Sequence, residues 1–336
     1  MRDTGISVPI ATDPTKIASN HLVYRTSKSN EDSRSLDFVL RNGLAGGVAG
    51  CAAKTIVAPL ERIRILFQTS HSHFVQYTAR WNGLIKAARE IRSLYGMPAL
   101  FKGHSASLVR VFPYAGINFL AYEQFRAAII PSTEKEAPWR RFLCGSMAGA
   151  TSTLVTYPLE LIRTRLAFET VQKNPSSWLS ISRKIYFEGG GSGSLSNLYR
   201  GIAPTMLGIL PYAGMSFLTH DLLRDLLRTP TLAPYTLESP SSTRLTAVAQ
   251  LSCGAVAGIV AQTISYPIDI IRRRIQVRSV DHAKDGILET ARCIFLERGV
   301  RGFYVGLTIG YVKMAPMAAT SFYVYDRMKR FLGLIK

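Results

Sequence analysis

The stretch Gly46–Arg64, GGVAGCAAKTIVAPLERIR, recurs twice more along the chain. The copies are GSMAGATSTLVTYPLELIR at Gly145–Arg163 and GAVAGIVAQTISYPIDIIR at Gly254–Arg272, and all three align without a gap. Each copy contains GxxxG, then a proline, an acid two residues after it and a base three residues after the acid. The prolines stand 99 and 109 residues apart, so the chain is built from a repeat of about a hundred residues.

A second element follows each copy and also aligns without a gap. It reads LFKGHSASLVRVFPYAGINFLAYEQFR, then LYRGIAPTMLGILPYAGMSFLTHDLLR, then FYVGLTIGYVKMAPMAATSFYVYDRMK. Each repeat therefore has two apolar segments joined by a longer polar stretch. We expect repeats at 38–131, 138–229 and 244–332, preceded by a disordered polar extension over 1–37.

Charges almost vanish from six stretches of the chain, namely 43–60, 105–122, 142–159, 202–219, 245–268 and 307–325. Such lengths suit membrane-spanning helices, which need roughly 20 apolar residues. The GxxxG pairs let helix backbones approach closely, and the recurring prolines can kink helices. The sequence therefore predicts an all-α membrane protein with six transmembrane helices rather than a soluble helical repeat.

The long loops between the two spans of each repeat hold 21 Lys and Arg against 10 acids. The two loops that connect the repeats hold 7 basic and 6 acidic residues. If the membrane is the mitochondrial inner membrane, the positive-inside rule places the long loops in the matrix. Both termini then face the intermembrane space.

Composition and motifs exclude several other classes of protein. The 336 residues carry a net charge of +19 while 47% of them are hydrophobic, and no nucleic-acid-binding motif appears. The four cysteines show no CxxC spacing and no catalytic constellation recurs, so we expect no enzyme, no metal and no cofactor. The first 37 residues lack an apolar signal core and contain acids, which indicates that any targeting signal is internal.

The six apolar stretches contain three charged residues, all cations: Lys54, Arg110 and Lys313. A buried cation at bilayer depth costs a few kcal/mol at least, so these are candidates for a functional site. The sequence places no carboxylate at the same depth. An anionic substrate is therefore expected, and several negative charges would match the three cations.

These motifs resemble the mitochondrial carrier family, whose signature is Pro-x-[Asp/Glu]-x-x-[Lys/Arg] at the end of each odd helix. The resemblance covers about residues 38–332. It implies six helices in a barrel with threefold pseudosymmetry, a central cavity, short amphipathic helices on the matrix side and alternating access. A functional monomer in the mitochondrial inner membrane is also expected.

The resemblance assigns two sets of gate residues. The matrix gate would pair Glu61 with Arg163, Glu160 with Arg272 and Asp269 with Arg64. Glutamine braces fall at Gln68 and Gln276, whereas the second repeat has Ala167 at that position. The cytoplasmic gate would pair Glu123 with Arg224, Asp221 with Lys329 and Asp326 with Arg126.

A looser family motif, aromatic-[Lys/Arg]-Gly, is expected to offer helix N-termini to cardiolipin phosphates. Phe101-Lys102-Gly103 and Tyr199-Arg200-Gly201 match it, but the third copy reads Tyr304-Val305-Gly306. The second copy is also lengthened by residues 190–194. Cardiolipin is thus the expected lipid partner, and these departures weaken the expectation in the second and third repeats.

The family's substrate contacts fall on the even helices, at Arg110, at Gly208 with Ile209, and at Lys313. The Gly-Ile pair is similar to that of carriers of adenine-containing substrates, and Lys54 matches a phosphate-contacting lysine of nucleotide carriers. Tyr212 would either stack on the base or pack between helices. Within the family the whole pattern looks closest to the coenzyme A carriers.

Other substrates remain open at this point. An ADP/ATP exchanger would show three arginines followed by methionines, but Arg272-Arg273-Arg274 is followed by Ile-Gln-Val. A calcium-regulated ATP-Mg/phosphate carrier would carry N-terminal EF-hands, and none appears in residues 1–37. A carrier of adenosine 3',5'-diphosphate fits the same contacts, and a relative that no longer transports is a further alternative.

Overall fold

The computed structural model describes residues 36–78, 82–130, 137–170, 177–189, 193–229, 245–278 and 286–334, with positions 232 and 236. Within these ranges every extended regular element is a helix. This confirms the predicted all-α class. Nearly all of the expected N-terminal extension lies outside the described residues, as do positions 190–192 of the lengthened second repeat. The chain divides into two compact units, one over 50–320 and one that combines 36–49 with 321–334.

The odd helices are the longest elements. They are α2 (Leu36–Gln68), α5 (Pro138–Phe168) and α9 (Ala247–Val277), of 33, 31 and 31 residues. At 1.5 Å per residue each exceeds roughly 45 Å, more than the thickness of a bilayer core. Each contains the proline of the repeated motif, and the acid and base of that motif occupy the same helix after it.

The even helices begin at glycines. These helices are α4 (His104–Ile129), α7 (Ile202–Leu227) and the pair α11 (Leu307–Val312) and α12 (Met314–Phe331). Their N-caps Gly103, Gly201 and Gly306 have φ of +85°, +82° and +80°, a conformation that other residues adopt only with strain. At Gly103 a Cβ atom would also lie 2.8 Å from the backbone oxygen of Arg163, so glycine permits close packing on α5.

The last even helix is interrupted at Lys313, between α11 and α12. Pro316 follows three residues later, and a proline removes one helical hydrogen bond and clashes with the carbonyl four residues before it. That carbonyl belongs to Val312, the last residue of α11. The proline therefore accounts for the break that sets Lys313 at a helix junction.

Three short helices, α3 (Gly83–Tyr95), α6 (Trp178–Tyr186) and α10 (Ile287–Arg298), follow the odd helices. Each buries residues four apart: Ala87 and Ile91, Ile181 and Ile185, Thr290 and Ile294. Single 3₁₀ turns lie beside them, at Val75–Tyr77, Met97–Phe101, Leu195–Tyr199 and Gly299–Tyr304.

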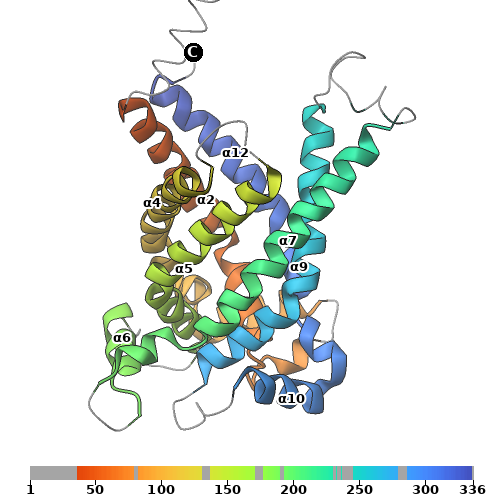
Figure 1. Cartoon of the computed structure of the whole chain (residues 1–336). Coiled ribbons are helices and arrows are strands. Elements are labelled where there is room, and N and C mark those ends of the chain that lie inside the picture. Colours follow the sequence, from red (N-terminus) through yellow and green to blue (C-terminus); the bar gives the residue numbers. More distant parts are fainter. Residues whose placement is uncertain are drawn as a thin grey trace, which may run out of the picture. The chain divides into compact units, whose positions relative to one another are not determined.

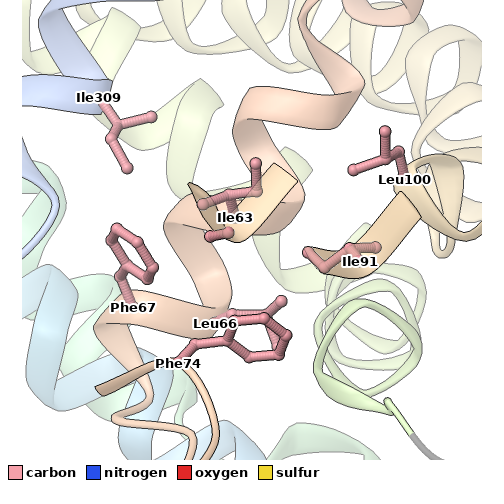
Figure 2. Close-up of a cluster of buried hydrophobic side chains, with 8 residues drawn as sticks. Ile63, Leu66, Phe67, Phe74, Ile91, Leu100 and Ile309 are labelled. Atoms are coloured by element: carbon pink, nitrogen blue, oxygen red, sulfur yellow. The ribbon is translucent and has the colours of Figure 1, made fainter. Parts of the chain in front are cut away.

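The buried hydrophobic residues form three clusters, each built around the C-terminal half of one odd helix and the short helix that follows it. Figure 2 shows the first, in which Ile63, Leu66 and Phe67 of α2 meet Ile91 of α3 and Ile309 of α11. The second includes Tyr157 and Leu161. Because the clusters lie where the acid–base motifs end, they fix the helix ends that carry those charges.

Two pairs of long helices pack along each other within the larger unit. α4 lies beside α5, and α7 lies beside α9 (Figure 1). Each of these pairs joins an even helix of one repeat to the odd helix of the next repeat. The repeats are therefore held together in sequence order by helix pairs.

Three helical stretches are long and apolar enough to cross a membrane: Leu40–Gln68, Leu195–Leu227 and Ala247–Val277. The other expected spans fall on α4, α5 and the α11–α12 pair, which are more polar. α4 carries Arg110, α5 is rich in glycine, serine and threonine, and α12 has 18 residues because of the break at Lys313. Such polarity is typical of helices with one face toward a water-filled interior.

The smaller unit joins the start of α2 to the end of α12. Arg41 donates to the backbone oxygen of Leu332 at 3.1 Å, and Tyr325 donates to Asn42 at 3.4 Å. Arg41 also pairs with Asp37 at 2.8 Å. These contacts link the two helix ends within this unit.

We predict that Ile91→Ala lowers the free energy of unfolding by about 2–5 kcal/mol, because it opens a cavity in a fully buried cluster. Leu94→Ala on the same helix is the matched control, since Leu94 is 56% exposed. Thermal unfolding in mild detergent measures both variants. Equal losses in the two would show that the first cluster does not anchor α3.

Candidate functional site

The acid–base motifs of the three odd helices meet in one charge network, called here the odd-helix network: Glu61, Arg64, Glu160, Arg163, Asp269 and Arg272. Arg163 pairs with Glu61 and Arg272 pairs with Glu160. Arg64 approaches Asp269 at 3.9 Å. The structure thus brings together each pair that the family resemblance expected at the matrix gate, and its role as a gate stays a prediction.

Helix geometry explains why these pairs join different helices. Acid and base are three residues apart, so both lie on the same face of their own helix. Each acid therefore faces a base of a neighbouring odd helix. The network closes in a ring because α2, α5 and α9 each contribute one acid and one base.

Glu160 is the centre of the network. Besides Arg272, its carboxylate contacts Arg110 at 2.9 Å and Arg273 at 3.5 Å, and its side chain is 4% exposed. A buried carboxylate is tolerated only where cations and hydrogen bonds compensate its lost hydration. Asp269 is the contrasting member, because its side chain is 39% exposed.

The expectation that Arg110 and Lys313 meet no carboxylate is wrong. Arg110 pairs with Glu160 at 2.9 Å, and Lys313 pairs with Glu61 at 3.1 Å. The sequence argument compared the depth of Cα atoms, whereas these long side chains reach more than one helical turn along the structure. Arg110 also donates to Thr156 at 3.1 Å and lies 5.0 Å from the centre of the Tyr114 ring.

Lys54 differs from the other two cations. No ion pair or hydrogen bond joins its ammonium group to another described residue, and it is not among the residues that line the central cavities. It lies within electrostatic range of Arg163, Glu61 and Arg110. Its expected role in contacting phosphate stays a prediction.

Two of the three brace positions contain glutamines that reach across to another repeat. Gln68 donates to the Tyr266 hydroxyl at 3.1 Å, and Gln276 donates to the Tyr157 hydroxyl at 3.0 Å. Both tyrosines directly precede the motif proline. At the remaining interface both partners are alanines, because Ala167 replaces the glutamine and Ala58 replaces the tyrosine.

A cavity of about 310 Å³ opens on the odd-helix network. Three carboxylates and six cations line it, together with Ile65, Gln68, Tyr114, Thr153, Thr205 and Ile209. The six cations are Arg64, Arg110, Arg163, Arg272, Arg273 and Lys313. Although the carboxylates are paired, the lining keeps a surplus of positive charge, which favours an anion.

A second cavity, of about 320 Å³, adjoins the first and shares Tyr114, Thr153, Thr205 and Ile209 with it. Its lining adds Gly208, Tyr212, Pro204 and Ala213. Gly208 leaves a flat surface here, since a Cβ atom would approach Ile268 to 3.3 Å. The expected substrate contacts Arg110, Lys313, Gly208, Ile209 and Tyr212 therefore line one continuous space, called here the central cavity.

The residues expected at the cytoplasmic gate form few contacts. No ion pair joins Glu123 of α4 to Arg224 of α7, although the structure describes both side chains. In the smaller unit Asp326 pairs with Arg330 at 2.8 Å, and the Lys329 ammonium lies 4.6 Å from the centre of the Tyr325 ring. The expected roles of Arg126 and Asp221 likewise stay predictions.

The basic residues of the aromatic-basic-glycine motif bind protein groups. Lys102 pairs with Glu169 at 3.0 Å, and Arg200 donates to the backbone oxygen of Arg278 at 2.8 Å. The motif therefore links neighbouring repeats in this structure. Cardiolipin binding at these helix starts stays a prediction.

Sequence reasoning did not identify Arg273 and Tyr114 as cavity residues. Arg273 donates to Thr164 at 2.7 Å and to Gln276 at 3.0 Å, and it faces Glu160. Its position directly after Arg272 was visible, but its direction toward the interior was not. Tyr114 has the same repeat position as Tyr212, and that correspondence would have revealed it.

Helices with a charged network at one end of a polar central cavity define a membrane transporter. The family model for mitochondrial carrier proteins matches residues 36–132, 134–231 and 243–336. The chain therefore belongs to the mitochondrial carrier family, whose members are transporters of the mitochondrial inner membrane and not enzymes.

Several curated proteins resemble the chain over most of its length. The Saccharomyces cerevisiae mitochondrial carrier protein LEU5 is 47% identical over 92% of this chain and 95% of its own length. Human solute carrier family 25 member 16 is 39% identical, with coverage of 88% and 89%. The Zea mays mitochondrial carrier protein CoAc2 is 36% identical, with coverage of 88% and 87%.

We predict that Glu160→Gln destabilises the protein far more than Asp269→Asn. Removing the Glu160 charge leaves three arginines around a buried site, which costs about 3–5 kcal/mol. The half-exposed Asp269 pair is worth about 0–1 kcal/mol. Thermal unfolding of both purified variants in the same detergent compares the two, and similar losses would contradict the central role of Glu160.

Proposed function

We propose that this carrier transports coenzyme A, or a closely related adenine-containing phosphorylated compound, across the mitochondrial inner membrane by alternating access. The observation that carries the proposal is the two-part central cavity. One part is lined by six cations, and the adjoining part presents Gly208, Ile209 and Tyr212.

Phosphate groups match the charged part of the cavity. Arg110 and Lys313 lie on its wall and carry guanidinium and ammonium groups, which form strong charge-assisted hydrogen bonds to phosphate. Coenzyme A carries a pyrophosphate and a 3'-phosphate, so it can engage several cations at once. A compound with a single negative charge would leave most of the positive surplus without a partner.

A purine base matches the adjoining part. Gly208 provides a flat backbone surface, Ile209 an apolar side chain, and Tyr212 an aromatic ring that is 46% exposed. A base–aromatic stack is worth about 1–3 kcal/mol. Because this surface adjoins the cations, base and phosphates of one molecule can occupy both parts together.

Substrate binding would also weaken the odd-helix network. Arg110 and Lys313 pair with the network carboxylates Glu160 and Glu61. Phosphates that draw these cations away leave both carboxylates with fewer partners, which lowers the free-energy difference between the closed and open network. The bound anion would thereby promote the conformational change that carries it across.

The comparisons support the same substrate class. The name of the maize relative, CoAc2, suggests a coenzyme A carrier, and the yeast relative is the more similar of the two in sequence. We further propose both termini in the intermembrane space, a functional monomer and contact with cardiolipin. The excess of basic residues in the long loops supports that orientation.

We predict that coenzyme A competes best against labelled coenzyme A uptake by liposomes that contain only this protein. Dephospho-coenzyme A should bind more weakly by about 1–3 kcal/mol, because it lacks the charge-assisted hydrogen bonds of the 3'-phosphate. ADP should compete more weakly still. Equal inhibition by ADP and coenzyme A, or uptake of ATP without coenzyme A, would contradict the proposed substrate.

The same assay locates the site. Arg110→Ala and Lys313→Ala should abolish uptake, whereas Lys86→Ala removes an exposed cation of α3 and should not. Normal membrane insertion of each variant is the control. Wild-type uptake by the first two would exclude both cations as substrate ligands.

We predict that Tyr212→Ala weakens coenzyme A binding by about 5- to 150-fold, the range that corresponds to losing one base–aromatic stack. Tyr212→Phe keeps the ring and should stay near the wild type. Inhibition of uptake by pyrophosphate, which has no base, is the discriminating measurement. If Tyr212→Ala weakens pyrophosphate and coenzyme A equally, Tyr212 packs between helices and does not bind the base.

A further inference from the structure

A second positively charged cavity lies at the C-terminal ends of the odd helices, with a volume of about 590 Å³. It is lined by Thr69, Ser70, Val75, Phe168, Arg274, Val277, Arg278, Glu297 and Arg298. Three arginines and one carboxylate thus face the same space. It shares no lining residue with the central cavity.

The odd-helix network separates the two cavities. On α2, Glu61 to Gln68 line the central cavity, and the chain from Thr69 onward lines the second. On α9 the change occurs between Arg273 and Arg274. The second cavity therefore lies where an anion would emerge if the network opened.

Thr69, Phe168 and Val277 show that this cavity lies at the common end of all three repeats. Each stands ten residues after the proline of its own repeat. All three line the second cavity. One repeat position, contributed three times, thus surrounds the opening beyond the network.

Arg274 is held in place by its neighbours. It donates to Glu297 at 2.6 Å and to the Ser70 hydroxyl at 2.7 Å. Ser70 has φ of +51°, a left-handed conformation after a helix end that glycine adopts more easily. Serine at this strained position supplies the hydroxyl that orients Arg274, which glycine would not.

The other two arginines are also positioned. The backbone oxygen of Arg278 accepts hydrogen bonds from Arg165 at 2.5 Å and from Arg200 at 2.8 Å, which ties the end of α9 to the second repeat. Arg298 donates to Thr78 at 3.3 Å. Burial lowers the pKa of Arg298, and neighbouring Arg274 lowers it further while Glu297 opposes the shift, so positive charges crowd this cavity.

We propose that Arg274, Arg278 and Arg298 form a second anion-binding site, which receives the phosphate groups of a soluble anion on the far side of the odd-helix network. Three arginines against one carboxylate concentrate anions locally, as charged clefts do. Val75, Phe168 and Val277 offer apolar contacts beside them. An anion held here is placed to enter or leave the central cavity when the network opens.

The test places a thiol in the cavity by Val75→Cys and measures its modification by peptide-resolved mass spectrometry in detergent. An anionic methanethiosulfonate should react about tenfold faster than a neutral one of similar size, because the arginines attract it. Pyrophosphate should slow the anionic reagent. The native Cys51 and Cys293, both partly exposed, serve as internal controls of reagent activity.

In the Val75→Cys background, Arg278→Gln with Arg298→Gln should abolish both the preference and the protection. Arg292→Gln with Arg301→Gln is the matched control, because it removes two exposed arginines that do not line the cavity. An unchanged rate with the neutral reagent shows that the fold is intact. An unchanged preference and unchanged protection by pyrophosphate in the cavity variant would overturn the proposal.

A lipid phosphate is the other possible source of the anion. Protection by added cardiolipin but not by pyrophosphate would therefore also overturn the proposal of a soluble anion. The experiment does not depend on coenzyme A as the substrate, because pyrophosphate is the probe. Failure of the second site would leave the uptake and competition assays to decide the transported compound separately.

Discussion

The buried carboxylate of Glu160 is the constraint on which the rest of the site depends. At 4% exposure it has lost its hydration, so it requires Arg110, Arg272 and Arg273 around it. These cations come from two helices other than its own. The helices must therefore hold their ends in register, and the three buried clusters at the ends of the odd helices provide that register.

The same cations serve two purposes that compete. Arg110 and Lys313 stabilise the odd-helix network through Glu160 and Glu61, and both also line the central cavity. A network of this kind is less stable than an apolar core of the same volume could be. It has a property that an apolar core lacks, because an anion can replace the carboxylates as a partner and thereby change the stability of the closed state.

The three interfaces of the network are not equivalent. Glutamine–tyrosine hydrogen bonds support two of them, whereas Ala58 and Ala167 occupy the third. There Arg62, which is 2% exposed, donates to the backbone oxygens of Ala167 and Glu169 at 3.2 and 3.0 Å. An arginine that is buried outside the cavity thus replaces the missing brace with bonds to backbone atoms.

The sequence alone determined the repeat, the helical class, the paired spacing of acids and bases, and the even-helix positions that line the cavity, because all of these follow from local periodicity. It indicated that three cations lie in apolar surroundings. Only the tertiary structure decided which carboxylates meet Arg110 and Lys313, that Arg273 turns inward, and that Arg274, Arg278 and Arg298 gather around one space. Those contacts join residues far apart in the chain through side chains that reach beyond one helical turn, and a linear pattern contains no information about the distance between helices.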